Sequence, residues 1–225
     1  MRAAPPSLIC FDLDGTLVDS APDLCLALGA ALNALGLERP TERQTRSWIG
    51  DGVENLLRRA LAHAGSTDNQ NFRSALDAFH VSYMQNLFNR SVLYPDAKVV
   101  LQRLQHDGHR LCCITNKRFE YAQELLVRAD IAAAFEFVFG GDTFEQKKPH
   151  PRQLLEAAAR TGVESGNCVM VGDSDTDSDA AAAAGYRFFW AAWGYCPALK
   201  NRAPADTMRI AQLADLPEVL QQSKS

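Results

Sequence analysis

The spacing of apolar residues changes twice along the chain. Residues 8–13 form an almost uninterrupted apolar run, which is typical of a short buried strand. From about residue 18 to residue 92, apolar residues recur every three to four positions and predict a series of amphipathic helices. Beyond residue 93, short apolar runs alternate with helical stripes as far as a final helix predicted at 216–221.

Strands that alternate with helices indicate a parallel sheet covered by helices on both faces. The first strand belongs to the same sheet as the later strands, so the helical stretch is an insertion into the part of the chain that forms the sheet. We therefore predict an α/β core formed by residues 1–17 and 93–225, with a helical insertion at residues 18–92. Within the insertion, Ser20 with Asp23 predicts a capping box for the first helix, and Thr41 with Gln44 opens the second.

Composition narrows the choice of partners and compartment. The 225 residues carry a net charge of −4 and are 47% hydrophobic, as in ordinary globular proteins, so we expect neither a nucleic-acid nor a membrane partner. No apolar run is long enough to cross a bilayer, and residues 1–7 lack a signal-peptide hydrophobic region. The six cysteines form no C-x-x-C pair, so we expect free thiols and a cytoplasmic protein, either monomer or homodimer.

Two carboxylates crowd the end of the first strand. Asp12 and Asp14 lie two positions apart, and residues two apart in an extended chain point to the same side. Their mutual repulsion is relieved if a cation lies between them or if one of them holds a proton. Gly15 then permits a sharp turn, and Thr16 completes an Asp-x-Asp-Gly-Thr string.

Other polar residues follow the later strands. Open α/β sheets bind ligands beyond the carboxyl ends of their strands, so these residues should share one edge with Asp12 and Asp14. They are Thr115, Asn116, Lys148, Asp173 and Asp177. Carboxylates, a hydroxyl and a lysine together predict a site for a divalent cation and a phosphate.

A division of labour within this set follows from its chemistry. Mg²⁺ prefers oxygen ligands, which Asp12, Asp173 and the main-chain oxygen of Asp14 can supply. A free oxygen of Asp12 can attack phosphorus, and Asp14 can exchange protons with the leaving alcohol and with water. We expect Thr115, Asn116 and Lys148 to bind the phosphoryl group, and Asp177 to support the metal waters or Lys148.

Four segments of the chain resemble the motifs of haloacid dehalogenase-like phosphohydrolases. They are Asp12–Thr16, Ile114–Asn116, Lys148–Pro149 and Gly172–Asp177. The resemblance covers nearly the whole chain and implies a Rossmann-like, doubly wound core with an inserted α-helical cap at residues 18–92. It also implies Mg²⁺ as cofactor and a phospho-aspartyl intermediate on Asp12.

Within that superfamily the chain is similar to bacterial phosphoglycolate phosphatases. The similarity includes the stretches 11–22, 48–52, 115–117 and 140–151 and implies hydrolysis of 2-phosphoglycolate, a small phosphorylated metabolite. Those enzymes usually continue Thr-Asn-Lys with Pro, whereas this chain has Arg118.

Two other functions fit the same residues. One is a phosphatase of another small phosphoester, such as a sugar or amino-sugar phosphate, and the other is a non-enzymatic phospho-acceptor domain. The second needs neither Asp14 nor a cap of some seventy residues. Substrate choice is expected to lie in the cap, in the loop at residues 48–52 that contains Gly50 and at three arginines. Arg46, Arg58 and Arg59 are the candidates to meet a substrate carboxylate.

Overall fold

The predicted parallel sheet forms the centre of the molecule. In the computed structural model, residues 7–196, 199 and 207–222 are described, so the predicted core limits at residues 1 and 225 and most of the N-terminal segment lie outside them. The six described strands of the main sheet run in the order β5-β4-β1-β6-β7-β8, and every neighbouring pair is parallel. These strands are β5 (Phe137–Phe139), β4 (Arg110–Ile114), β1 (Leu8–Phe11), β6 (Cys168–Gly172), β7 (Arg187–Ala191) and β8 (Met208–Ile210). The predicted fold class is confirmed.

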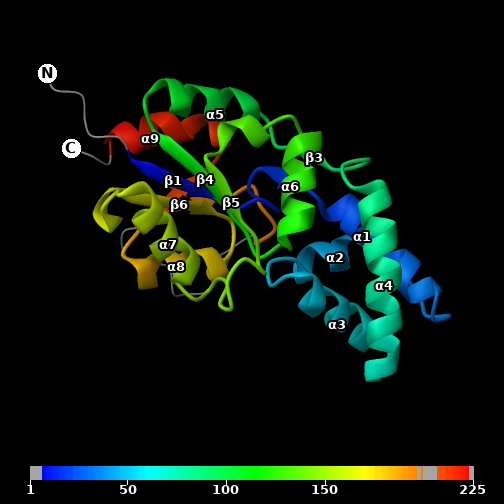
Figure 1. Cartoon of the computed structure of the whole chain (residues 1–225). Coiled ribbons are helices and arrows are strands. Elements are labelled where there is room, and N and C mark those ends of the chain that lie inside the picture. Colours follow the sequence, from blue (N-terminus) through cyan, green and yellow to red (C-terminus); the bar gives the residue numbers. More distant parts are fainter. Residues whose placement is uncertain (1–6, 197–198, 200–206, 223–225) are drawn as a thin grey trace, which may run out of the picture.

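Helices cover both faces of the sheet, as Figure 1 shows. One face carries α5 (Ala97–His106), α6 (Phe119–Arg128) and α9 (Leu216–Gln222), and the other carries α7 (Arg152–Thr161) and α8 (Asp175–Ala184). Short 3-10 turns join the core elements at Ala132–Ala134, Ser165–Asn167 and Leu213–Asp215.

The central strand β1 explains why its sequence is apolar without alternation. Ile9 and Phe11 pack into the cluster beneath α5, α6 and α9, whereas Leu8 and Cys10 pack into the cluster beneath α7 and α8. All four side chains are fully buried. A strand buried on both faces places its carboxyl end at a rigid point of the fold.

The insertion forms four helices at one end of the sheet (Figure 1). They are α1 (Ala21–Asn33), α2 (Glu42–Trp48), α3 (Val53–His63) and α4 (Asn69–Asn86). The chain enters and leaves this cap through a short antiparallel pair, β2 (Val18–Asp19) and β3 (Val92–Leu93). Fully buried side chains such as Leu28, Leu57 and Phe79 form the interior of the cap and belong to the same apolar cluster as Phe11 of the core.

The two predicted helix starts in the cap have different outcomes. Thr41 and Gln44 form the reciprocal hydrogen bonds of a capping box at α2. The capping box predicted for Ser20 and Asp23 at α1 is wrong, because both side chains have distant partners. Ser20 Oγ donates to Asp14 (2.5 Å), and the Asp23 carboxylate accepts the main-chain N–H groups of residues 90 and 91 (both 2.9 Å). Tertiary hydrogen bonds replace the local ones here.

Cys10, Cys25, Cys112, Cys113 and Cys168 are free thiols in the structure. Cys10, Cys112, Cys113 and Cys168 are buried in the sheet. Among the described residues, no helix is both long and apolar enough to cross a membrane.

Candidate active site

The acidic residues predicted to act together meet at the carboxyl end of the sheet. Asp12 follows β1, and Asp173 follows the neighbouring strand β6. One turn into the next helix, Asp177 adds a third carboxylate. Oxygen atoms of these three side chains all lie within 4.8 Å of one another, and all three residues are buried.

Lys148 binds two of these carboxylates. Its Nζ lies 2.8 Å from Asp12 Oδ1 and 2.6 Å from Asp177 Oδ1, and it also donates to the main-chain oxygen of Ile114 at 2.7 Å. Only 2% of the lysine is exposed. Burial by itself would lower the pKa of Lys148, but the charges of Asp12 and Asp177 outweigh burial and raise it. The ammonium group therefore stays charged beside Asp12.

The buried carboxylates have more negative charge than Lys148 balances. Burial raises the pKa of Asp12 to about 7, opposed by Lys148 and assisted by the charge of Asp177. Burial also raises the pKa of Asp173 well above its usual range, and the charges of Asp177 and Asp12 add to this rise. A divalent cation would relieve this repulsion, and a set of carboxylate oxygens suits Mg²⁺.

The hydrogen bonds of Asp177 separate its role from that of the two other carboxylates. Oδ1 accepts from Lys148, and Oδ2 accepts from the main-chain N–H and the hydroxyl of Ser174 (3.1 and 2.6 Å). Both oxygens thus have partners, in keeping with the predicted supporting role. Asp12 and Asp173 remain the side chains best placed to hold a cation.

Glycines make room for the carboxylates. Gly15 has φ +88°, and a Cβ atom at this position would collide with the carboxylate of Asp173. A Cβ on Gly194 would meet the same carboxylate, and one on Gly172 would meet Asp177. Gly15 was a predicted turn residue, but its tight packing against Asp173 depends on the folded core.

Asp14 is not a member of the group formed by Asp12, Asp173 and Asp177. Lys117 Nζ lies 2.9 and 3.0 Å from its two carboxylate oxygens, and Ser20 donates to it. The Asp14 carboxylate thus has a cation and a hydroxyl as partners, and its predicted proton exchange with the ligand stays a prediction. Its predicted main-chain metal ligand stays a prediction.

Sequence reasoning assigned no role in the site to Lys117 or Tyr195. Lys117 follows Thr115 and Asn116 directly, so its position in the motif was a signal that could have indicated it. Tyr195 had no such signal, because the partners of its hydroxyl come from the other end of the chain. Its main-chain N–H donates to Asp173 Oδ2 (2.6 Å), and its hydroxyl accepts from the N–H groups of Ser20 and Ala21 (2.8 and 3.0 Å).

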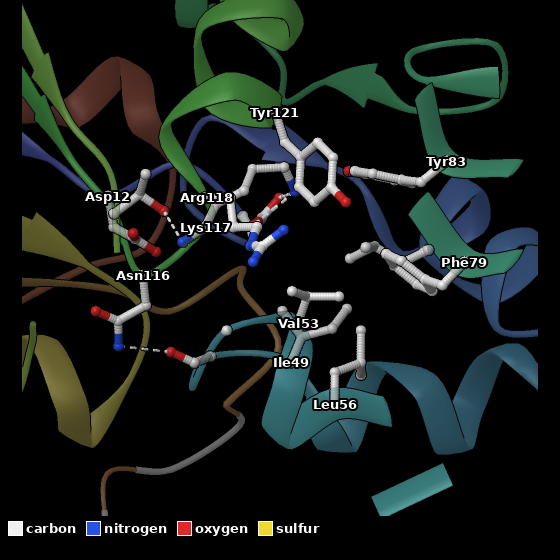
Figure 2. A pocket seen from close by; sticks show the side chains of 15 residues that line it. Asp12, Ile49, Val53, Leu56, Phe79, Tyr83, Asn116, Lys117, Arg118 and Tyr121 are labelled. Atoms are coloured by element: carbon white, nitrogen blue, oxygen red, sulfur yellow. Dashed lines mark hydrogen bonds and ion pairs between the residues drawn. The ribbon is translucent and has the colours of Figure 1, made fainter. Parts of the chain in front are cut away.

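The two predicted phosphate-binding residues after β4 differ in orientation. Thr115 is buried and lines the cavity beside Asp12. The side-chain amide of Asn116 instead donates to the main-chain oxygens of Gly50 (3.0 Å) and Lys148 (2.9 Å). Figure 2 shows this amide turned toward the cap loop. Its side-chain amide is thus already engaged, and phosphate binding by Asn116 stays a prediction.

A small cavity lies between these core residues and the cap (Figure 2). This inner cavity has a volume of about 40 Å³. The core contributes Asp12, Asp14, Thr115, Asn116, Lys117, Arg118 and Tyr121. The cap side chains that close it are mostly apolar: Leu24, Ile49, Val53, Leu56, Phe79 and Tyr83. A ligand held on Asp12 would thus have its other end against an apolar wall.

Of the cap residues predicted to meet the substrate, Gly50 lines the inner cavity, whereas the arginines do not. Arg58 lies over the ring of Phe72, 4.1 Å from its centroid. Arg59 binds the carboxylate of Asp51 and the main-chain oxygen of Trp48. The prediction that Arg58 or Arg59 reaches the ligand is not supported by this arrangement, because neither side chain lines the inner cavity.

Arg46 is also engaged elsewhere. Its guanidinium forms two hydrogen bonds of 2.8 Å with Asp19, and the side chain borders a separate outer cleft on the Asp173 side. The hydrogen bond to Asp19 holds the pKa of Arg46 above its ordinary value.

Several known proteins are similar to this chain in sequence and in fold. The family model of haloacid dehalogenase-like hydrolases matches residues 9–191. A phosphoglycolate phosphatase of Nitrosococcus oceani is 36% identical over 220 residues, which cover 97% of this chain and 98% of the relative. One from Aliivibrio fischeri is 39% identical over 84% of this chain and 85% of its own length. The crystal structure of a predicted phosphoglycolate phosphatase from Haemophilus somnus superposes with a TM-score of 0.89 at 32% identity, covering 95% of this chain and 97% of that one.

Proposed function

The chain belongs to the haloacid dehalogenase-like hydrolase family, and on that premise we propose that this phosphatase hydrolyses 2-phosphoglycolate to glycolate and phosphate. The reaction would depend on Mg²⁺ and proceed through a phospho-aspartyl intermediate on Asp12. The observation that carries the proposal is the position of Asp12, which opens into the inner cavity while Lys148 holds one of its oxygens. The names of the relatives support the choice of substrate.

The acidic residues fit the cofactor that the family implies. Asp12 and Asp173 would hold Mg²⁺, together with the predicted main-chain oxygen of Asp14, because buried carboxylates that repel one another gain from a hard cation. Bound there, Mg²⁺ would withdraw charge from the phosphoryl oxygens and reduce their repulsion of the nucleophile.

The protein's own side chains account for the bonds that change. A carboxylate oxygen of Asp12 forms a bond to phosphorus as the bond to the ester oxygen breaks. Asp14, which lines the same cavity, gives its proton to the departing glycolate oxygen. Water then attacks phosphorus and gives a proton to Asp14, and Asp12 is released with inorganic phosphate. Lys148 stays bonded to Asp12 and balances charge near the transferred group.

The cavity favours a small leaving group. About 40 Å³ corresponds to roughly three water molecules, and apolar cap residues close it on the far side. A two-carbon acid suits this space better than a sugar ring.

Phosphate release from a panel of monoesters tests the proposal. With Mg²⁺, we expect 2-phosphoglycolate to have a kcat/KM at least about tenfold above those of hexose and amino-sugar phosphates, and EDTA to abolish turnover. A sugar phosphate turned over more efficiently would contradict the substrate. Labelling of Asp12 that stops at one equivalent, with no phosphate released, would contradict the enzymatic function.

A further inference from the structure

We propose that Arg118 is the specificity residue that binds the carboxylate of the substrate's leaving group. This role rests on the proposed function, because it requires a phosphoester whose non-phosphate end is anionic. Arg118 belongs to the core rather than to the cap, where the sequence led us to expect a group of this kind.

The position of Arg118 is the first support. It directly precedes α6 with extended backbone angles (φ −54°, ψ 140°), two residues after the phosphate-site pair Thr115 and Asn116. Its side chain lines the inner cavity together with Asp12. Figure 2 shows the guanidinium directed into the cavity, toward Val53 and Ile49 of the cap. A phosphoester whose phosphoryl group lies at Asp12 would therefore extend its other end toward the guanidinium of Arg118.

The other cations around the site have different partners. Among the described residues, the cationic side chains that line the inner cavity are Lys117 and Arg118. Lys117 is almost fully buried and forms its ion pair with Asp14. The cap arginines Arg58 and Arg59 are held by Phe72 and by the Trp48–Asp51 loop. The cap wall opposite is apolar and offers no charge to a carboxylate.

The ion-pair partner of Arg118 is itself a carboxylate, and the guanidinium also interacts with the hydroxyl of Tyr121, another residue of the cavity. Arg118 Nε lies 3.3 Å from Glu54 Oε1, at the start of α3 in the cap. Both side chains are about two-fifths exposed, at 40% and 41%, so their ion pair is screened by water and weak. A substrate carboxylate in the cavity can replace Glu54, since a guanidinium binds a carboxylate through two parallel hydrogen bonds. Glu54 thus acts as an internal competitor for the same cation.

Steady-state kinetics with a matched pair of substrates test this role. Ethyl phosphate has the two-carbon leaving group of 2-phosphoglycolate with a methyl group in place of the carboxylate. We expect Arg118→Met to lower kcat/KM for 2-phosphoglycolate by about ten- to a hundredfold more than for ethyl phosphate, mainly through KM. Arg118→Lys should recover part of this loss, because it restores the charge without the planar fork. Glu54→Gln should raise kcat/KM for 2-phosphoglycolate alone.

Arg152→Met is the matched control, since it removes an exposed arginine that pairs with Glu156 on α7, away from the cavity. It changes net charge equally and should leave both substrates unaffected. If Arg118→Met affects the two substrates equally while the wild type prefers 2-phosphoglycolate, this inference is wrong and the proposed function stands. If the wild type does not prefer 2-phosphoglycolate to ethyl phosphate, the proposed substrate and the role of Arg118 are both wrong.

Discussion

The side-chain amide of Asn116, at the end of β4 in the core, donates a hydrogen bond of 3.0 Å to the main-chain oxygen of Gly50 in the cap. The same amide donates to the main-chain oxygen of Lys148, so one residue ties the cap loop to the loop that carries the active-site lysine. The cap is thereby held over Asp12 by a contact that involves no substrate. A core residue thus helps to position the cap loop that contains Gly50.

Loss of this tie should loosen the loop. In Asn116→Ala we expect faster amide hydrogen exchange at residues 49–53 and a kcat/KM lower by about tenfold, because the cavity wall is less well ordered. Asn55→Ala is the control, since Asn55 donates to the neighbouring oxygen of Asp51 from within the cap. It should change neither quantity. Unchanged exchange in Asn116→Ala would show that the loop is held by other contacts.

The adjacent lysines provide a sharp test of charge balance at the nucleophile. Lys148→Met should lower kcat by about a hundredfold or more, because it removes the cation bonded to Asp12. It should also lower metal-free stability by about 3 kcal/mol, because Asp177 and Asp12 stay buried without it.

The comparison variant is Lys147→Met. The Lys147 ammonium donates to the main-chain oxygen of Asp51 rather than to a carboxylate of the site. We expect its loss in kcat to be at least about tenfold smaller than that of Lys148→Met, because Lys147 contacts the cap loop and not the nucleophile, and its unfolding midpoint in urea to change little. Equal losses in the two variants would contradict the role assigned to Lys148.

The covalent step depends on Asp12. Asp12→Asn keeps the size of the side chain but removes the nucleophilic charge, so kcat should fall by at least about a thousandfold. The variant should fold normally, as judged by circular dichroism, and should not be labelled by phosphate. Turnover close to that of wild type would exclude a phospho-aspartyl intermediate.

Metal binding should depend on pH. Burial raises the pKa of Asp12 to about 7, so below that pH the protonated form of Asp12 is favoured in the metal-free folded state. Its contribution to stability is therefore present below about pH 4 and is lost as pH rises through about 7. Mg²⁺ needs ionised ligands and must displace the protons at low pH.

The gain in melting temperature on adding Mg²⁺ should thus be larger at about pH 8 than at about pH 5.5. Thermal unfolding with Mg²⁺ and with EDTA at the two pH values measures it, and Asp12→Asn should reduce the difference. A gain that does not depend on pH would show that these carboxylates are already ionised without metal.

Much of the fold and of the site's outline could be predicted because the signals are local. The apolar run of β1 and the stripes of the helices report which faces are buried, whatever they pack against. Strand ends can be located in the same way, and parallel strands bring their carboxyl ends to one edge. That is sufficient to place Asp12 and Asp173 at one edge of the sheet, whereas Lys148 lies in the loop that follows β5.

The choice of partners could be decided only by the tertiary structure. Ser20 had a good local signal as a helix cap, yet its hydroxyl binds Asp14 and its N–H binds Tyr195, 175 positions away. Arg59 and Arg118 are both arginines near the site, but one holds a loop and the other lines the cavity. A polar side chain binds whichever charged or hydrogen-bonding group the completed fold brings within about 3 Å. This competition among distant groups leaves no periodic trace in the sequence, whereas burial does.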